Sequence, residues 1–300
     1  MIKYISIIFL SSFLFSISLQ EIYDNSTSQN GYDKYLVLDS DSIYTGGIGI
    51  YEGDIFIDCN SAIIDLESGN GIWVYSDEQY SSSLEIEYCN IVNGDYYGLS
   101  FGGNSTGNIK NCNLLNTNYG LKLFDESNVT VINSIFSYNQ TYGIGMYTEN
   151  PTLNITYSLF WENIEDDCME NCPGWGSIWT QLEPNPGTGV IYENPLFENY
   201  NNFNFNLNEN SPCINNGNPL ILDQDGTFSD IGANTYNQEE CLIIGDLNSD
   251  GIINVLDITN AICEILSNGC IAECNWDMNH DTELNVLDII IIMNNIINNY

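Results

Sequence analysis

Two stretches near the C-terminus carry oxygen-bearing side chains at the spacing of a calcium-binding loop. The first reads GDLNSDGIINVLDI from Gly245 to Ile258, and the second reads WDMNHDTELNVLDI from Trp276 to Ile289. A calcium ion takes roughly six to eight oxygen ligands, so alternate residues of a tight loop must point inward. We therefore predict two Ca2+ sites, with ligands at loop positions 1, 3, 5, 7, 9 and 12. In the first loop these are Asp246, Asn248, Asp250, Ile252 through its main chain, Asn254 and Asp257. In the second they are Asp277, Asn279, Asp281, Glu283 through its main chain, Asn285 and Asp288.

The two loops differ at position 6, where the chain must turn sharply and glycine is preferred. Gly251 meets this requirement in the first loop, whereas Thr282 occupies the position in the second. The second site is therefore expected to bind calcium more weakly.

Each loop is followed by apolar residues at helical spacing, so each unit is predicted to be a loop and then a helix. The second stripe repeats the first 31 positions later. The predicted stripes are Ile258, Ala261, Ile262, Ile265 and Leu266, then Ile289, Ile292, Met293, Ile296 and Ile297.

This duplicated pattern resembles the dockerin type I module over about the last sixty residues. The resemblance implies a calcium-dependent domain that plugs into a cohesin-like partner on a scaffold or cell surface. It also implies that loop positions 10 and 11 select the partner, and these are Val255, Leu256, Val286 and Leu287. Because the pair is the same in both halves, either half is expected to dock. The alternative is that these apolar residues seal the core of the module.

The middle of the chain repeats every 22 to 24 residues between about residues 55 and 165. Alternation typical of strands lies between turns rich in Asn and Gly. One repeat cannot bury its own apolar face, but stacked copies can, which predicts an all-β right-handed parallel β-helix. The aligned columns are Ile86, Ile109, Val131 and Ile155; Cys89, Cys112, Ser134 and Ser158; Ile91, Leu114, Phe136 and Phe160; and Gly98, Gly120 and Gly143.

The repeats, with the SPCINNGNP and SDIGANTY segments between Asn194 and Tyr236, resemble the pectin-lyase-like superfamily of parallel β-helices. This resemblance covers roughly residues 45–237 and implies an association with polysaccharides. Lyases of the superfamily commonly abstract a proton with Arg or Lys, and its glycosidases use clustered aspartates with His and Arg. The chain has no arginine, and its one histidine is His280. Two functions thus remain open: a polysaccharide lyase or glycoside hydrolase, or a non-catalytic adhesion or structural protein of the cell surface.

One face of the predicted β-helix has residue types that suit a sugar. Counting two residues past each repeat glycine gives Trp73, Ser100, Lys122 and Gly145 facing outward, with Val74, Phe101, Leu123 and Met146 facing inward. Lys122 and Trp73 are the candidate substrate-binding residues, with Asp125 and Glu149 as acceptors for hydroxyl groups. The acids are expected to raise the pKa of Lys122, which argues against its use as a base. The alternative is a purely structural ladder of aromatic rings.

The net charge of −37, from 41 acids and 4 lysines, argues against binding to nucleic acid or to anionic membranes. Lys3 followed by the apolar run from Ile5 to Ile17 has the form of a secretory signal, with a retained anchor as the alternative. The protein is thus expected to be extracellular, where its ten cysteines can form disulfides. The expected organisation is a signal peptide (1–18), a lead-in (19–44), the β-helix (45–237) and the dockerin-like module (241–300).

Overall fold

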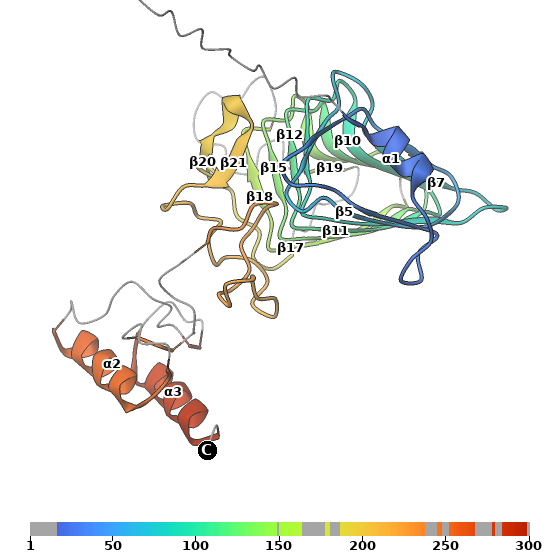
Figure 1. The fold of residues 1–300 in the computed structure, drawn as a ribbon. Coiled ribbons are helices and arrows are strands. Elements are labelled where there is room, and N and C mark those ends of the chain that lie inside the picture. The colour runs from blue at the N-terminus through green and yellow to red at the C-terminus, as the bar shows by residue number, and fades with distance from the viewer. Residues whose placement is uncertain are drawn as a thin grey trace, which may run out of the picture.

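The computed structural model describes residues 17–148, 150–163, 178–180, 187–237, 245–247, 252–267, 278–279 and 284–298. Its largest part is a solenoid in which short strands follow one another in a fixed cycle (Figure 1). Within the described residues, the cycle builds three parallel sheets, and each coil adds one strand to each sheet. The predicted parallel β-helix is therefore confirmed.

The three sheets are listed here in spatial order. The first contains β1 (Ile17–Ser18), β3 (Ile43–Thr45), β6 (Ile63–Asp65), β9 (Asn90–Val92), β12 (Asn113–Leu115), β15 (Ile135–Ser137) and β18 (Leu159–Trp161). The second, called the platform sheet below, contains β4 (Gly49–Ile50), β7 (Ile72–Ser76), β10 (Tyr97–Gly103), β13 (Tyr119–Leu123), β16 (Tyr142–Met146) and β19 (Ile178–Thr180). The third contains β2 (Lys34–Val37), β5 (Gly53–Asp58), β8 (Ser82–Glu87), β11 (Thr106–Lys110), β14 (Asn128–Ile132) and β17 (Thr152–Thr156).

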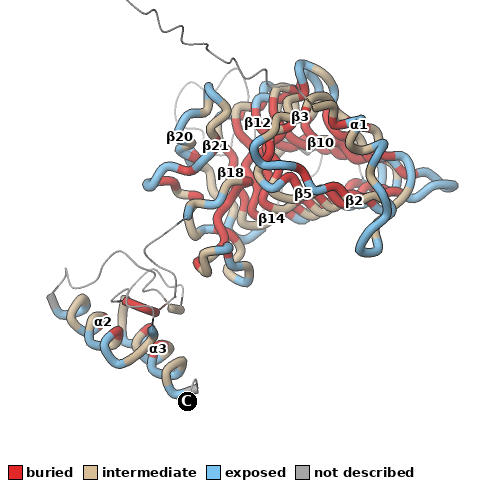
Figure 2. The backbone as a smooth tube through the Cα atoms, in the orientation of Figure 1, coloured by how far each residue is buried: buried red, intermediate tan, exposed pale blue. Residues whose placement is uncertain are grey.

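The register of the sheets follows the sequence columns. Ile109 pairs with both Ile86 and Val131, and Val131 pairs in turn with Ile155. The column that ends in Phe136 and Phe160 is also in register, and the two rings stack inside the solenoid with centroids 5.1 Å apart. Figure 2 shows the buried backbone concentrated in these coils. Stacked apolar columns thus form the core that no single coil could bury.

The turns between the sheets explain why the repeats are rich in Asn. Asn111 and Asn133 turn the chain from the third sheet into the first with φ of 46° and 52°, and Tyr88 does so with φ of 52°. Asn adopts this left-handed conformation more readily than most residues, because its short side chain can hydrogen-bond locally. Gly120 is required for a different reason, since a Cβ there would lie 2.6 Å from the carbonyl oxygen of Gly143 in the next coil.

Helix α1 (Leu19–Asn25) covers one end of the solenoid core. Ser18 is its N-cap, and Leu19 is fully buried in the main core cluster. Lys34 binds the other end of the helix, with Nζ 2.7 Å from the carbonyl oxygen of Tyr23. The stretch 19–44 therefore contributes a cap and the strands β2 and β3 to the solenoid.

The segment after the coils, residues 210–237, runs back along the side of the solenoid as a closing segment. It follows the antiparallel pair β20 (Phe197–Asn199) and β21 (Asn204–Leu207), which are joined by the short helix η1 (Tyr200–Asn202). Asn111 Nδ2 donates to the Asp230 carbonyl (3.0 Å), and Asn133 Nδ2 donates to Ser229 Oγ (2.9 Å). The closing segment thus holds successive coils together.

Two helices lie near the C-terminus, α2 (Val255–Ser267) and α3 (Val286–Asn298), as the repeated stripes predicted. Their small core contains Ala261 and Ile292, both fully buried. The predicted stripes are too wide, however, because half of their residues are exposed. These are Ile262, Ile265, Leu266, Met293 and Ile297. Among the described residues, no helix has the length and apolar character needed to cross a membrane.

Candidate functional site

The outward row predicted for the platform sheet lies in register. Ser100 pairs with Trp73 on one side and Lys122 on the other, and Lys122 pairs with Gly145. Their neighbours along each strand point inward. These buried neighbours are Val74, Phe101, Leu123 and Met146. The strand alternation therefore places Trp73 and Lys122 on one outer face, two strands apart.

Lys122 lies among aromatic rings. Its Nζ is 4.0 Å from the centroid of the Tyr119 ring and 5.1 Å from that of Tyr147. Both rings present electron-rich faces that attract a cation. Burial against them lowers the pKa of Lys122, because a desolvated ammonium is less stable. The expectation that neighbouring acids would raise this pKa is thus wrong.

Asp125, which is close to Lys122 in the sequence, interacts with a different part of the chain. Asp125 sits at an exposed turn with φ of 57°, and its Oδ2 accepts a 2.9 Å hydrogen bond from the backbone N–H of Gly103. Glu149 lies outside the described residues. Among the residues with described side chains, a salt bridge forms between Lys110 and Glu85, but both lie on the third sheet and not beside Lys122. The structure therefore brings together Lys122 and Trp73 of the predicted set.

Trp73 is the centre of a second group of rings on the same face. It stacks on Tyr75 with centroids 5.9 Å apart and packs edge-on against Phe124 at 6.2 Å. The ring of Tyr97 is tilted relative to that of Trp73, and their centroids are also 6.2 Å apart. Trp73 is half-buried as a result, and so is Lys122, although both were expected to be exposed. We call Trp73, Tyr97, Tyr119, Lys122 and Tyr147 the aromatic platform.

Ser100 lies between Trp73 and Lys122 in this row. It is fully buried, and its hydroxyl has no hydrogen-bond partner among the described residues. Buried polar groups are usually paired, and this hydroxyl is an exception. Because Ser100 is fully buried, Trp73 and Lys122 are the accessible side chains of this part of the row.

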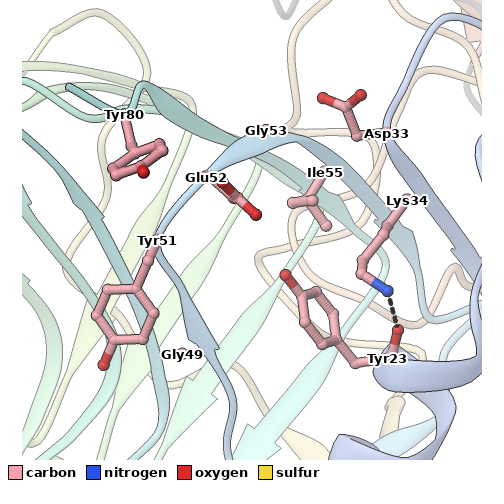
Figure 3. Close-up of a pocket in the computed structure, with 9 residues that line it drawn as sticks. All are labelled: Tyr23, Asp33, Lys34, Gly49, Tyr51, Glu52, Gly53, Ile55 and Tyr80. Atoms are coloured by element: carbon pink, nitrogen blue, oxygen red, sulfur yellow. Dashed lines mark hydrogen bonds between the residues drawn. The ribbon is translucent and has the colours of Figure 1, made fainter.

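A pocket near this face was not foreseen from the sequence. It has a volume of about 670 Å3 and is lined by residues from α1, β2 and β5, and from the segments at β4 and before β8 (Figure 3). The polar and aromatic lining residues are Tyr23, Asp33, Lys34, Tyr51, Glu52 and Tyr80. They come from separate coils and follow no repeat, so no column in the sequence pointed to them.

The first predicted calcium loop contains a buried carboxylate that accepts hydrogen bonds from backbone N–H groups. Asp257 is fully buried, and its two oxygens accept from Leu247 N (2.8 Å) and Asn254 N (2.7 Å). Asp246 is also buried, at 4% exposure. Asn254 accepts from Leu256 N at 2.8 Å and thereby caps α2. Asn248, Asp250 and Gly251 lie outside the described residues, whereas Ile252 is described.

The second loop repeats this arrangement. Asp288 is fully buried and accepts from Met278 N (2.8 Å) and Asn285 N (2.9 Å). Asn285 caps α3 by accepting from Leu287 N at 2.8 Å. Asn279 is described, while Asp277, Asp281, Thr282 and Glu283 are outside the described residues. Within the described part, no three acidic, His or Cys side chains converge as a complete metal cluster.

The chemistry of these loops fits a bound cation. No lysine or arginine occurs after Lys122 in the sequence, so no such side chain of the loops can neutralise the buried acids. Burying a carboxylate without a counter-charge is unfavourable. Each carboxylate oxygen can accept more than one interaction, so the backbone contacts leave room for a metal. Calcium, which prefers oxygen ligands, would supply the missing charge.

The predicted partner residues are on the surface of the helices. Val255 and Leu256 are exposed to 65% and 58% in the first turn of α2. Val286 and Leu287, at the same positions of α3, are exposed to 62% and 54%. Such exposure argues against the alternative that these residues seal the core of the module. Apolar side chains gathered on an exposed face are typical of a protein contact.

Comparison with known proteins agrees with both parts of the chain. The sequence model described as "Right handed beta helix region" matches residues 19–178, and the chain belongs to this family. A "Dockerin type I domain" model matches residues 244–297, so the chain ends in a dockerin type I domain. Dockerin type I domains typically bind calcium.

Among solved structures, the chain is similar to one titled "Crystal structure of pectate lyase Pel9A". The sequences are 12% identical, the match covers 74% of this chain and 96% of that chain, and the TM-score is 0.30. No curated protein matches the chain.

Proposed function

We propose that this chain is an extracellular glycan-binding protein that its dockerin domain attaches to a cohesin-bearing scaffold. The observation that carries the proposal is the aromatic platform, where Trp73 and Lys122 share one outward row of the solenoid. Sugar rings pack their C–H faces on aromatic rings, while their hydroxyl groups bond to nearby polar groups. Aromatic surface combined with a few fixed polar groups is typical of small-molecule sites.

Charge supports a neutral glycan as the ligand. The net charge of −37 repels polysaccharides rich in carboxylates. Of the lysines on the solenoid, Lys110 is paired with Glu85 and Lys34 holds the end of α1. Lys122 is left as a donor of hydrogen bonds on the aromatic platform.

The C-terminal domain supports attachment. We propose that Asp246, Asp257 and Asp288 belong to two calcium sites, and that Val255, Leu256, Val286 and Leu287 contact the cohesin. We also propose that residues 1–18 are a signal peptide, 19–44 a lead-in, 45–237 the β-helix and 241–300 the dockerin domain. In this arrangement the solenoid binds the glycan, and the dockerin keeps it at the scaffold.

The test is retention of the purified chain on insoluble polysaccharides, with calcium and with chelator. Cellulose, xylan and mannan serve as neutral probes, and pectate serves as the acidic probe. Trp73→Ala is expected to weaken retention on a neutral probe by about tenfold, because it removes an aromatic surface. Lys122→Ala is expected to weaken it several-fold.

Lys110→Ala is the matched control, since it removes a lysine from a different face. It should retain binding, and its melting temperature and those of the test variants should show that all remain folded. If the wild type is retained by none of the probes, or if the platform variants bind like the wild type, the proposed function is wrong.

A second candidate function is β-elimination on a uronate polysaccharide, and the lowered pKa of Lys122 favours it. The unprotonated Nζ would take the proton from the carbon beside the uronate carboxylate. The released electron pair would form a ring double bond as the C–O bond to the leaving sugar breaks, and that oxygen would take a proton from solvent. Unsaturated product from pectate, absent with Lys122→Ala, would support this activity, and its absence with the wild type would exclude it.

A further inference from the structure

The pocket of Figure 3 lies where the capping helix meets the platform sheet. Tyr23 comes from α1, Tyr51 follows β4, and Tyr80 lies in the loop before β8. Tyr51 and Tyr80 are exposed to 60% and 47%, so both rings are accessible to a ligand in the pocket. The pocket has a volume of about 670 Å3, which falls within the range of ligand pockets.

The charged groups of the pocket have different roles. Lys34 stabilises the end of α1 and is not available to a ligand. Its Nζ donates to the Tyr23 carbonyl (2.7 Å) and lies 4.6 Å from the centroid of the Tyr23 ring. Asp33 is held by the chain, since its Oδ2 accepts from the backbone N–H of Asp54 at 2.8 Å. Glu52 is exposed, and Figure 3 shows its carboxylate directed toward the space beside the Tyr23 hydroxyl. A carboxylate and a phenol on one side, with tyrosine rings around them, suit a ring bearing hydroxyl groups.

The pocket is continuous with the aromatic platform. Gly49, which also lines the pocket, pairs directly with Trp73 in the platform sheet. The Tyr51 ring lies over Gly49, since a Cβ on that glycine would be 2.6 Å from the ring. Tyr51 also lies near Tyr97, whose pKa it helps to raise after the larger effect of burial. Neighbouring strands are about 4.8 Å apart, which is close to the length of one sugar residue.

From these contacts we infer that the pocket is the terminal subsite of the glycan site, and that it binds the end of a neutral polysaccharide chain. The inference rests on the proposed function of the aromatic platform. A chain that crosses the strands from Lys122 past Trp73 arrives at Tyr51 and then meets Tyr23 on α1, which forms a wall. The last sugar lies between the tyrosine rings, and Glu52 accepts hydrogen bonds from its hydroxyl groups.

The test measures binding of linear β-1,4-linked hexasaccharides of glucose, xylose and mannose to the full chain by calorimetry. Glu52→Gln keeps the shape but removes the charge of the acceptor, so it should weaken binding of the preferred hexasaccharide by about tenfold. Tyr51→Ala should weaken it by about five- to tenfold. Glu209→Gln and Tyr96→Ala are the controls, because Glu209 is exposed on the segment after β21 and Tyr96 is exposed to 57% outside the pocket lining.

Limited acid hydrolysis of the matching insoluble polysaccharide supplies the second measurement, because it multiplies chain ends. The amount of wild-type protein bound per gram should rise with the number of ends, and this increase should be lost with Tyr51→Ala. If Trp73→Ala weakens binding while the pocket variants bind like the wild type, the inference is wrong and the proposed function stands. If the wild type binds no hexasaccharide and no polysaccharide, both are wrong.

Discussion

The backbone N–H of Leu247 donates a 2.8 Å hydrogen bond to the fully buried carboxylate of Asp257. The pair Met278 and Asp288 repeats this contact 31 residues later, also at 2.8 Å. Backbone hydrogen bonds therefore fix the carboxylate at position 12 of each predicted calcium loop without the help of a metal. Because the sequence after Lys122 contains no lysine or arginine, a bound cation would supply the charge that balances these buried carboxylates.

Calorimetric titration of the chelator-treated full chain should therefore detect two calcium ions. Asp257→Ala should abolish one site and leave the other, because each loop has its own ligands. Thr282→Gly should tighten the weaker site, since glycine allows the sharp turn at position 6. Two sites that remain in Asp257→Ala would contradict the assignment of this carboxylate.

The exposed Val–Leu pairs lead to a prediction about the partner. Leu256→Glu alone should change the affinity for a cohesin by less than about threefold, because α3 offers an equivalent surface. Leu256→Glu combined with Leu287→Glu should weaken binding by more than about a hundredfold, since each half then carries a charge in an apolar contact. Surface plasmon resonance measures the affinity, and circular dichroism checks the helices. Loss of helicity in the double variant would instead mean that these leucines support the fold.

The closing segment should make stability depend on pH. Burial raises the pKa of Asp223 to about 6 and that of Asp230 to about 7. Since both values exceed those of an unfolded chain, the folded state binds more protons between about pH 4 and pH 7. The contribution of these groups is therefore present at low pH and is lost as the pH rises through 6 and 7.

Asp223→Asn should reduce this loss, because the asparagine stays neutral. Its Oδ1 can still accept the 2.9 Å hydrogen bond from Asp230 N. Asp223→Asn should therefore raise the free energy of unfolding above that of the wild type, and this gain should be about 2 kcal/mol larger at pH 7.5 than at pH 4.5. Denaturant titrations at the two pH values measure this difference, and Asp95→Asn is the control, because Asp95 is exposed and lies outside the closing segment. Equal pH dependence in the wild type and Asp223→Asn would contradict the prediction.

The repeats carried most of the fold information. Columns such as Ile86, Ile109 and Val131 predicted both the architecture and the register, because stacking places equivalent residues one above another. The same alternation placed Trp73 and Lys122 on one face. The helix stripes predicted the helices but not which of their apolar residues are buried, because Ile262 and Met293 are exposed although Ala261 and Ile292 are fully buried.

Features that depend on contacts between unlike segments could not be predicted. Lys122 was expected to be near acids because Asp125 follows it closely in the sequence, yet the turn directs Asp125 to Gly103 N. Instead, the lysine lies beside the ring of Tyr119 on its own strand, β13, and the ring of Tyr147, which directly follows the neighbouring strand β16. The pocket near Tyr23 and Tyr51 likewise joins residues that belong to no column.

The disulfide between Cys59 and Cys89 was also beyond the sequence, since ten cysteines allow many pairings. It links two successive coils across 30 residues. Cys112 is next in the same column and is a buried free thiol, while Cys263 of α2 is disulfide-bonded. Further along the column, Ser134 Oγ accepts from Cys112 N (3.2 Å), and Ser158 Oγ accepts from Ser134 N (3.2 Å). A small side chain with an acceptor atom therefore suffices at this position.

Replacing both Cys59 and Cys89 with Ser should lower the free energy of unfolding by about 3–4 kcal/mol, because the bond restricts a loop of the unfolded chain. Cys112→Ser is the matched control. It should cost less than about 1 kcal/mol, since serine already serves in the next two coils and its hydroxyl can bond as theirs do. Denaturant titration under non-reducing conditions measures both changes. If Cys112→Ser destabilises the chain as much as the double variant does, packing of sulfur in the column matters more than the bond, and the loop-restriction argument fails.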